Sequence, residues 1–107
     1  MDEVIEAAAV THQALGHPTR LEMCWLLAER ERSVTELAED LGISQPLASQ
    51  HLRVLKDASL VAGRRESYWT LYRLLPARLE LVRDGAELLI DSGRKSRARI
   101  RPSRLSR

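Results

Sequence analysis

The fold is decided by the stretch SVTELAEDLGISQPLASQHLRVLK, residues 33–56. Its first half begins with a capping box, in which the Ser33 hydroxyl and the Glu36 side chain each satisfy a free backbone amide at the start of a helix. Hydrophobic residues then recur at helical spacing until Gly42 ends the helix. Two residues later, Ser44 can cap a second helix. Two amphipathic helices joined by a tight turn that contains glycine predict a helix-turn-helix.

The outer face of this second helix carries polar chemistry suited to DNA. The residues on this face are Gln45, Ser49, Gln50, Arg53 and Lys56. No acidic residue occurs on the helix before Asp57, whereas a solvated helix face normally mixes glutamate with lysine. Amides and hydroxyls near the beginning of a helix, followed by cations, suit base edges and phosphates. We therefore expect these five residues to contact DNA; the alternative is a neutral polar surface.

Two extended runs follow the helix-turn-helix. Residues 60–64 lead to a polar tip at residues 65–67, and residues 68–72 return with aromatic and β-branched side chains that favour strands. The pattern predicts a two-stranded β-hairpin, or wing. Its Arg64 and Arg65 are expected to reach phosphate or the minor groove of DNA.

The rest of the 107-residue chain supplies three further helical segments, and its length suits one domain. The first segment, residues 2–15, and the last, about 76–92, each carry an apolar stripe at helical spacing. The segment at about 18–30 is apolar nearly all round, which predicts a central and largely buried helix. Because phenylalanine is absent and aromatic residues total 4%, the core is expected to be aliphatic. The sequence thus predicts a mainly α fold of about five helices with a small β-hairpin.

Charge is distributed unevenly along the chain, although the net charge is only +2. Residues 94–107 contain seven Lys or Arg and no acid, whereas residues 1–93 contain 10 basic and 15 acidic residues, a net charge of −5. We expect one folded domain over residues 1–92, followed by a flexible basic arm over residues 93–107. The arm either adds affinity for nucleic-acid phosphates or serves only to keep the chain in solution.

The linked motifs closely resemble those of ArsR-type winged helix-turn-helix repressors, from about residue 5 to residue 90. The motifs that carry the resemblance are ALGHPTRL (14–21), SVTELA (33–38), SQPLASQHLRVL (44–55) and Leu60-Val61. The resemblance implies a homodimer whose first and last helices form the interface. It also implies binding to double-stranded DNA at an inverted-repeat operator near the protein's own promoter, so that transcription is blocked.

Two positions depart from the family pattern. Ser59 stands where the family usually has glycine after the recognition helix, and Glu66-Ser67 stands where the wing tip usually contains glycine. If Ser59 takes the left-handed cap conformation, it costs roughly 1 kcal/mol relative to glycine. Either change can alter the geometry of the wing, but neither threatens the fold.

The resemblance also raises metal sensing, which the residues do not support. Relatives use a cysteine pair near the start of the third helix, or histidines and acids on the last helix. Residues 31–39 contain no cysteine, and residues 76–92 contain no histidine. The carboxylates of the last segment form the stripe of a solvated helix face: Glu80, Asp84, Glu87 and Asp91. Because zinc requires three or four converging ligands, we expect neither a metal site nor a cofactor.

Cys24 is the only cysteine, which excludes an intramolecular disulfide. Some relatives oxidise a cysteine of the second helix against a partner in the last helix, but residues 75–92 contain no such partner. We expect Cys24 to be a small buried hydrophobe; the alternative is a redox-responsive thiol that acts alone or bridges two subunits. His51 is expected to brace the recognition helix, and His17 to cap the helix that follows it.

Two classes of function remain open, and a third is not expected. The first is a homodimeric, sequence-specific DNA-binding repressor. The second is a protein-interaction module whose winged-helix fold has lost DNA binding, which the acidic balance of residues 1–93 makes conceivable. An enzyme is not expected, because the glycines are isolated and no nucleophile–base pair can be assembled. No apolar run approaches 18 residues and the N-terminus lacks the features of a signal peptide, so we expect a cytoplasmic protein without a membrane span.

Overall fold

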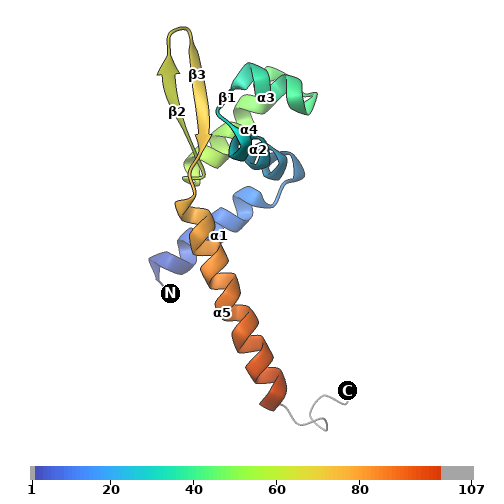
Figure 1. The fold of residues 1–107 in the computed structure, drawn as a ribbon, viewed down its shortest axis with the longest axis vertical. Coiled ribbons are helices and arrows are strands. Elements are labelled where there is room, and N and C mark those ends of the chain that lie inside the picture. Colours follow the sequence, from blue (N-terminus) through green and yellow to red (C-terminus); the bar gives the residue numbers. More distant parts are fainter. Residues whose placement is uncertain (1, 100–107) are drawn as a thin grey trace.

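The computed structural model describes residues 2–99, with side chains through residue 96. Over these residues the chain forms five helices and a small sheet (Figure 1), which confirms the predicted fold class. The elements are α1 (Glu3–Leu15), α2 (Pro18–Glu29), β1 (Arg32–Ser33), α3 (Val34–Leu41), α4 (Gln45–Asp57), β2 (Val61–Glu66), β3 (Trp69–Leu74) and α5 (Ala77–Arg99). No helix in this part of the chain combines the length and the apolar character needed to cross a bilayer.

The helix-turn-helix forms as its local sequence predicts. The Ser33 hydroxyl accepts a hydrogen bond from the Glu36 amide at 3.2 Å, and Glu36 Oε1 accepts one from the Ser33 amide at 3.0 Å. Gly42 ends α3 in the left-handed conformation, with φ of 67°. The Ser44 hydroxyl then accepts from the Leu47 amide at the start of α4. These contacts lie close together in sequence, so capping alone fixes where both helices of the motif begin.

The sheet has three strands in the order β1-β3-β2, all antiparallel. The two-residue strand β1 was not predicted, because two residues are too few for a strand pattern in the sequence. It pairs with β3 through Arg32↔Tyr72 and Ser33↔Leu71. Arg32 is buried and forms ion pairs with Glu29 of α2 and Asp40 of α3. The base of the wing is therefore attached directly to the residues that lead into α3.

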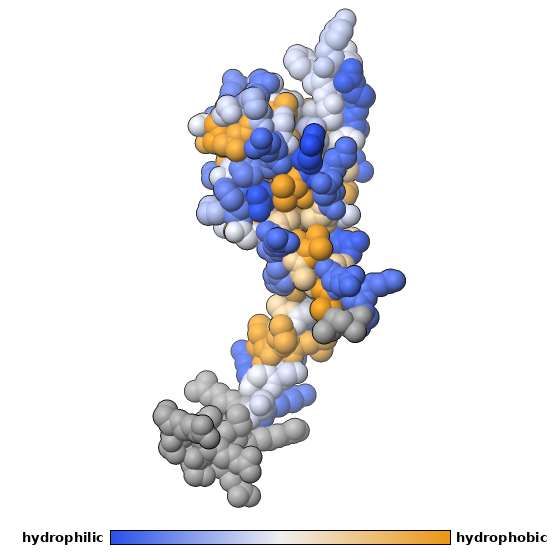
Figure 2. All heavy atoms as spheres, turned by 180° about the vertical axis from the view of Figure 1, so that it is seen from behind, coloured by the Kyte–Doolittle hydropathy of each residue, from blue (hydrophilic) through white to orange (hydrophobic). Residues whose placement is uncertain are grey.

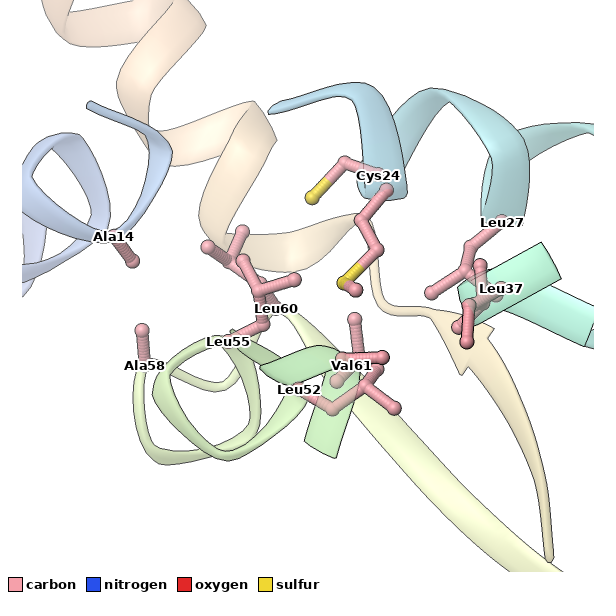
Figure 3. Packing of buried hydrophobic residues seen from close by; sticks show 12 residues of the cluster. Ala14, Cys24, Leu27, Leu37, Leu52, Leu55, Ala58, Leu60 and Val61 are labelled. Atoms are coloured by element: carbon pink, nitrogen blue, oxygen red, sulfur yellow. The ribbon is translucent and has the colours of Figure 1, made fainter. Parts of the chain in front are cut away.

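The core is aliphatic, as predicted, and lies between α2, α3, α4 and the base of the wing (Figure 3). Its fully buried members include Met23, Leu37, Leu55 and Leu60. The prediction that α2 is largely buried is wrong, because only Met23, Cys24 and Leu27 are buried and Trp25 is 71% exposed. Elements of this small chain cover only one side of α2, and the opposite side meets no other part of residues 2–99.

The last helix is longer than predicted. We expected it to end at about residue 92, whereas α5 continues through Arg99. Residues 93–99 contain three arginines, one lysine and one alanine, which are good helix formers, and cations are favourable near a helix C-terminus. The expected boundary between domain and basic arm therefore does not coincide with the end of a helix. The remainder of the expected arm, residues 100–107, lies outside the described residues.

Helix α5 packs against α1 only along its first part and then projects from the helical body (Figure 1). Hydrophobic residues gather on the projecting part, where they form an orange band in Figure 2. Leu88, Leu89 and Ile90 are at least half exposed there, and so are Val4 and Ile5 on α1. Large exposed apolar areas of this kind mark interaction surfaces in soluble proteins.

Ser59 adopts the left-handed conformation anticipated from its position, with φ of 60°. An L-residue in this region costs roughly 1 kcal/mol relative to glycine. We expect Ser59→Gly to raise the free energy of unfolding by about this amount in urea titrations. The control is Ser92→Gly inside α5, which should lower the free energy, because glycine is a poorer helix former than serine. Destabilisation by Ser59→Gly would contradict the strain assigned to this cap.

Candidate nucleic-acid interface

Helix α4 presents its polar face outward. Ala48, Leu52 and Leu55 anchor the opposite side of the helix in the core. All residues predicted to contact DNA have exposed side chains: Gln45, Ser49, Gln50, Arg53, Lys56, Arg64 and Arg65. Within residues 2–99, neither Arg53 nor Lys56 forms an ion pair, so their charges are not neutralised by an acid of the described chain. The face therefore offers amides, a hydroxyl and two cations to a ligand.

Gln45 is positioned by a residue that the sequence reasoning missed. Its Nε2 donates a hydrogen bond to the Thr35 hydroxyl at 3.0 Å, which joins the first turn of α4 to the first turn of α3. Thr35 is itself exposed and lies ten residues earlier in the chain. Only the turn between the two helices brings these side chains together, so no local signal could have identified the pair.

A hollow of about 350 Å³ lies between α4 and β3. It is lined by Ser49, Leu52, Arg53, Lys56, Asp57 and Tyr72. The ring of Tyr72 fits closely over Gly63 of β2, where an added Cβ atom would lie 3.0 Å from its Cε1 atom. Two cations in a concave surface between a recognition helix and a wing suit the backbone of a nucleic acid. Tyr72, a further residue that the sequence reasoning missed, lines this hollow from β3.

The two wing arginines lie on opposite faces of the sheet, because neighbouring residues of a strand alternate. Arg65 lines a second hollow with Thr35, Tyr68 and Trp69, and within residues 2–99 it forms no ion pair. Arg64 instead forms ion pairs with Glu31 and Glu66. The structure therefore does not bring the two arginines together. Only Arg65, like Arg53 and Lys56 of α4, forms no ion pair with the described residues.

His51 supports α4 from its buried side. Its ring lies 4.7 Å from the His17 ring, centroid to centroid, and Arg20 Nη1 donates to His51 Nδ1 at 3.4 Å. His17 Nδ1 in turn accepts from the Thr19 amide at 3.1 Å and caps α2. Both predicted roles, the brace and the cap, are confirmed. Burial lowers the pKa of His51, and the charges of His17 and Arg20 add to this effect.

This arrangement predicts a loss of stability in mild acid. Because the pKa of His51 is lower in the folded chain than its ordinary value of about 6.5, the unfolded chain binds the proton more readily. The contribution of neutral His51 is fully present above that ordinary value and is lost as the pH falls below it. We expect thermal stability to fall as the pH drops below about 6.5, and to fall less steeply in His51→Gln.

The control for this measurement is Gln13→Ala at an exposed position of α1, a substitution that changes no titratable group. It should retain the wild-type dependence of stability on pH. If His51→Gln and the wild type lose stability in parallel on acidification, His51 does not carry the effect.

Comparisons with known proteins decide the family. The family model described as "bacterial regulatory protein, arsR family" matches residues 17–62. A solved structure from Mycobacterium bovis, the homodimeric winged helix-turn-helix DNA-binding domain of a possible ArsR-family transcriptional regulator, has a TM-score of 0.65 and 31% identity, covering 83% of this chain and 81% of that one. This chain belongs to the ArsR family.

Other similar proteins are also regulators. The ArsR-like transcriptional regulator from Rhodococcus sp. RHA1 has a TM-score of 0.76 and 26% identity, covering 88% of this chain and 90% of that chain. The HTH-type transcriptional repressor SmtB from Mycobacterium tuberculosis is 43% identical over 72 residues, which make up 67% of this chain and 53% of SmtB. The chain therefore spans about half the length of that repressor.

Cys24 of this ArsR-family chain is packed as a small hydrophobe (Figure 3). Its side chain is buried in the core, and this burial raises the pKa of the thiol to about 11. At neutral pH the thiol is therefore protonated, and the protonated form is the less reactive one. Among residues 2–99, no group of three or more His, Cys, Asp or Glu side chains is arranged to hold a metal ion.

Proposed function

We propose that this ArsR-family chain is a sequence-specific DNA-binding transcriptional repressor. The observation that carries the proposal is the outer face of α4, where Gln45, Ser49 and Gln50 precede two cations, Arg53 and Lys56, that form no ion pair with residues 2–99. In this assignment the amides and the hydroxyl contact base edges, and glutamine suits adenine in a bidentate pair. Arg53 and Lys56 hold phosphates at the hollow between α4 and β3, and Arg65 holds one at the second hollow, on the wing.

The proposed repressor is a homodimer that binds an inverted-repeat operator. The apolar surfaces of α1 and projecting α5 support this assembly, because a second copy would cover them. The M. bovis relative is described as homodimeric, which also supports it. A twofold dimer places two recognition helices in successive major grooves, about 34–36 Å apart. Because the similar proteins are transcriptional regulators, we propose regulation rather than catalysis.

Selection of bound DNA from a random-sequence pool tests this function. We expect enriched duplexes to contain two inverted half-sites separated by one helical turn. Enrichment of a single half-site would contradict the proposed dimer. An absence of enrichment in dilute buffer would contradict sequence-specific DNA binding and favour the alternative of a protein-interaction module.

The basic segment over residues 94–107 is proposed to add affinity that does not depend on sequence. Deleting residues 100–107 removes three arginines and leaves the described part of α5 intact. The slope of log affinity against log salt should then become shallower by roughly 0.9 for each phosphate that the shortened chain no longer neutralises. An unchanged slope would favour the alternative of an inert solubilising tail.

A further inference from the structure

We propose that Arg64 orients the wing through Glu31 and does not hold a DNA phosphate. This inference rests on the proposed function, and it changes the role that the sequence predicts for Arg64. The sequence pattern pairs Arg64 with Arg65 as two phosphate contacts of one hairpin, whereas the structure gives the two side chains different surroundings.

The guanidinium of Arg64 is already engaged by two carboxylates. Its Nη2 donates to Glu31 Oε1 at 2.8 Å, and its Nη1 donates to Glu66. These hydrogen bonds raise the pKa of Arg64. The hydrogen bond from Arg64 also holds the pKa of Glu31 below its ordinary value, and the charge of Arg73 acts in the same direction. Arg64 and Glu31 are therefore both charged at neutral pH, and the contact between them is a charge-assisted hydrogen bond.

A phosphate that approached Arg64 would have to compete with two carboxylates for the guanidinium. Glu31 and Glu66 would also repel it at close range. Arg65 meets neither obstacle, because it faces the other side of the strand and forms no ion pair with the described residues. The two arginines of the wing thus have different electrostatic surroundings.

The Arg64–Glu31 contact joins the wing to the segment between α2 and β1. Strand β1 pairs only with Leu71 and Tyr72, so the outer part of the hairpin extends beyond the three-stranded ladder. Among residues 2–99, Arg64–Glu31 is the only ion pair between the wing and another element. Loss of either partner would free the outer hairpin to change its angle to α4, and Arg65 would change position with it.

The salt dependence of DNA binding separates orientation from phosphate contact. Affinity for a duplex selected from the random pool is measured over a range of salt concentrations for the wild type, Arg64→Gln and Arg65→Gln. Arg65→Gln should reduce the slope of log affinity against log salt by roughly 0.9, as expected when one phosphate is no longer neutralised. Arg64→Gln should weaken binding about two- to fivefold, in the range of a surface ion pair, and leave the slope unchanged.

A double-mutant cycle tests the role of Glu31. Glu31→Gln should weaken binding to the same extent as Arg64→Gln, and the double variant should be no weaker than either single one. The control is Glu39→Gln, an exposed acid of α3 that measures the general effect of removing a negative charge. The proposal is overturned if Arg64→Gln lowers the salt slope as Arg65→Gln does, or if Glu31→Gln strengthens binding more than Glu39→Gln.

Hydrogen exchange on the DNA-free chain supplies a readout that does not depend on DNA binding. Amides of the outer hairpin should exchange faster in Arg64→Gln and Glu31→Gln, and at the wild-type rate in Arg65→Gln. If the outer hairpin exchanges at the same rate in all four proteins, the proposed orienting role of the Arg64–Glu31 contact is overturned, whatever the binding results. If the wild type selects no duplex, the proposed function is refuted. If the variants then still show the expected exchange rates, the Arg64–Glu31 contact keeps its assigned role of orienting the wing.

Discussion

Leu89→Glu is expected to convert the proposed dimer into monomers and to weaken binding to the selected duplex by roughly 10²–10⁴-fold. Leu89 is 75% exposed and lies next to the exposed Leu88 and Ile90 of α5, on the apolar surface that a second copy would cover in the proposed dimer. A carboxylate buried there without a partner is strongly unfavourable. The weaker binding follows because a monomer engages one half-site and cannot engage the second one through a linked subunit. Sedimentation equilibrium and duplex titration measure the two effects on the same samples.

Leu89→Met is the control for this substitution, because it retains an apolar side chain of similar volume. It should remain dimeric and bind as the wild type does. A Leu89→Glu chain that stays dimeric, or a monomeric chain that keeps wild-type affinity, would contradict the assigned interface. Leu89 lies outside the core of the single chain, so circular dichroism should show an intact fold in both variants.

Leu55→Ala should lower the free energy of unfolding by about 2–5 kcal/mol. Leu55 is fully buried on the inner side of α4, against α2 and the base of the wing, so truncation leaves a cavity. Domains of this kind are stable by only about 5–15 kcal/mol, which makes this a large fraction of the total. Urea denaturation at a fixed protein concentration measures the change.

Val54→Ala is a matched control on the neighbouring residue of the same helix. Val54 is 40% exposed, so its truncation creates no buried cavity, and alanine is the better helix former. We expect its effect to stay within about 0.5 kcal/mol. Equal losses of stability at the two positions would contradict the orientation of α4 and, with it, the identity of the face presented to DNA.

Local features of the sequence predicted the helix-turn-helix and the placement of its polar face. The Ser33 and Ser44 caps and the Gly42 stop act within one helical turn, so their consequences can be derived from neighbouring residues. The strained cap at Ser59 was anticipated on another basis, because the resembling family usually has glycine at this position. The outward direction of Gln50 and Arg53 follows from helical periodicity once the buried side of α4 is known.

Features that depend on distant residues could not be predicted in this way. Strand β1 exists only because β3, nearly 40 residues later, pairs with it. The contact between Arg64 and Glu31 depends on the same pairing. The sequence alone therefore gives no reason to distinguish Arg64 from Arg65. The exposure of Trp25 likewise depends on which side of α2 the other elements cover.

The central claim is that the outer face of α4 reads bases, and Gln50→Ala tests it most directly. The quantity to measure is the ratio of affinities for the selected duplex and for a random duplex, determined at one salt concentration for the wild type and the variant. Gln50 is exposed on α4 and absent from the buried core, so its truncation should leave the fold intact. The account predicts that the ratio falls by the equivalent of about 1–3 kcal/mol for each base that Gln50 reads through a bidentate pair. A ratio that stays at the wild-type value would contradict it.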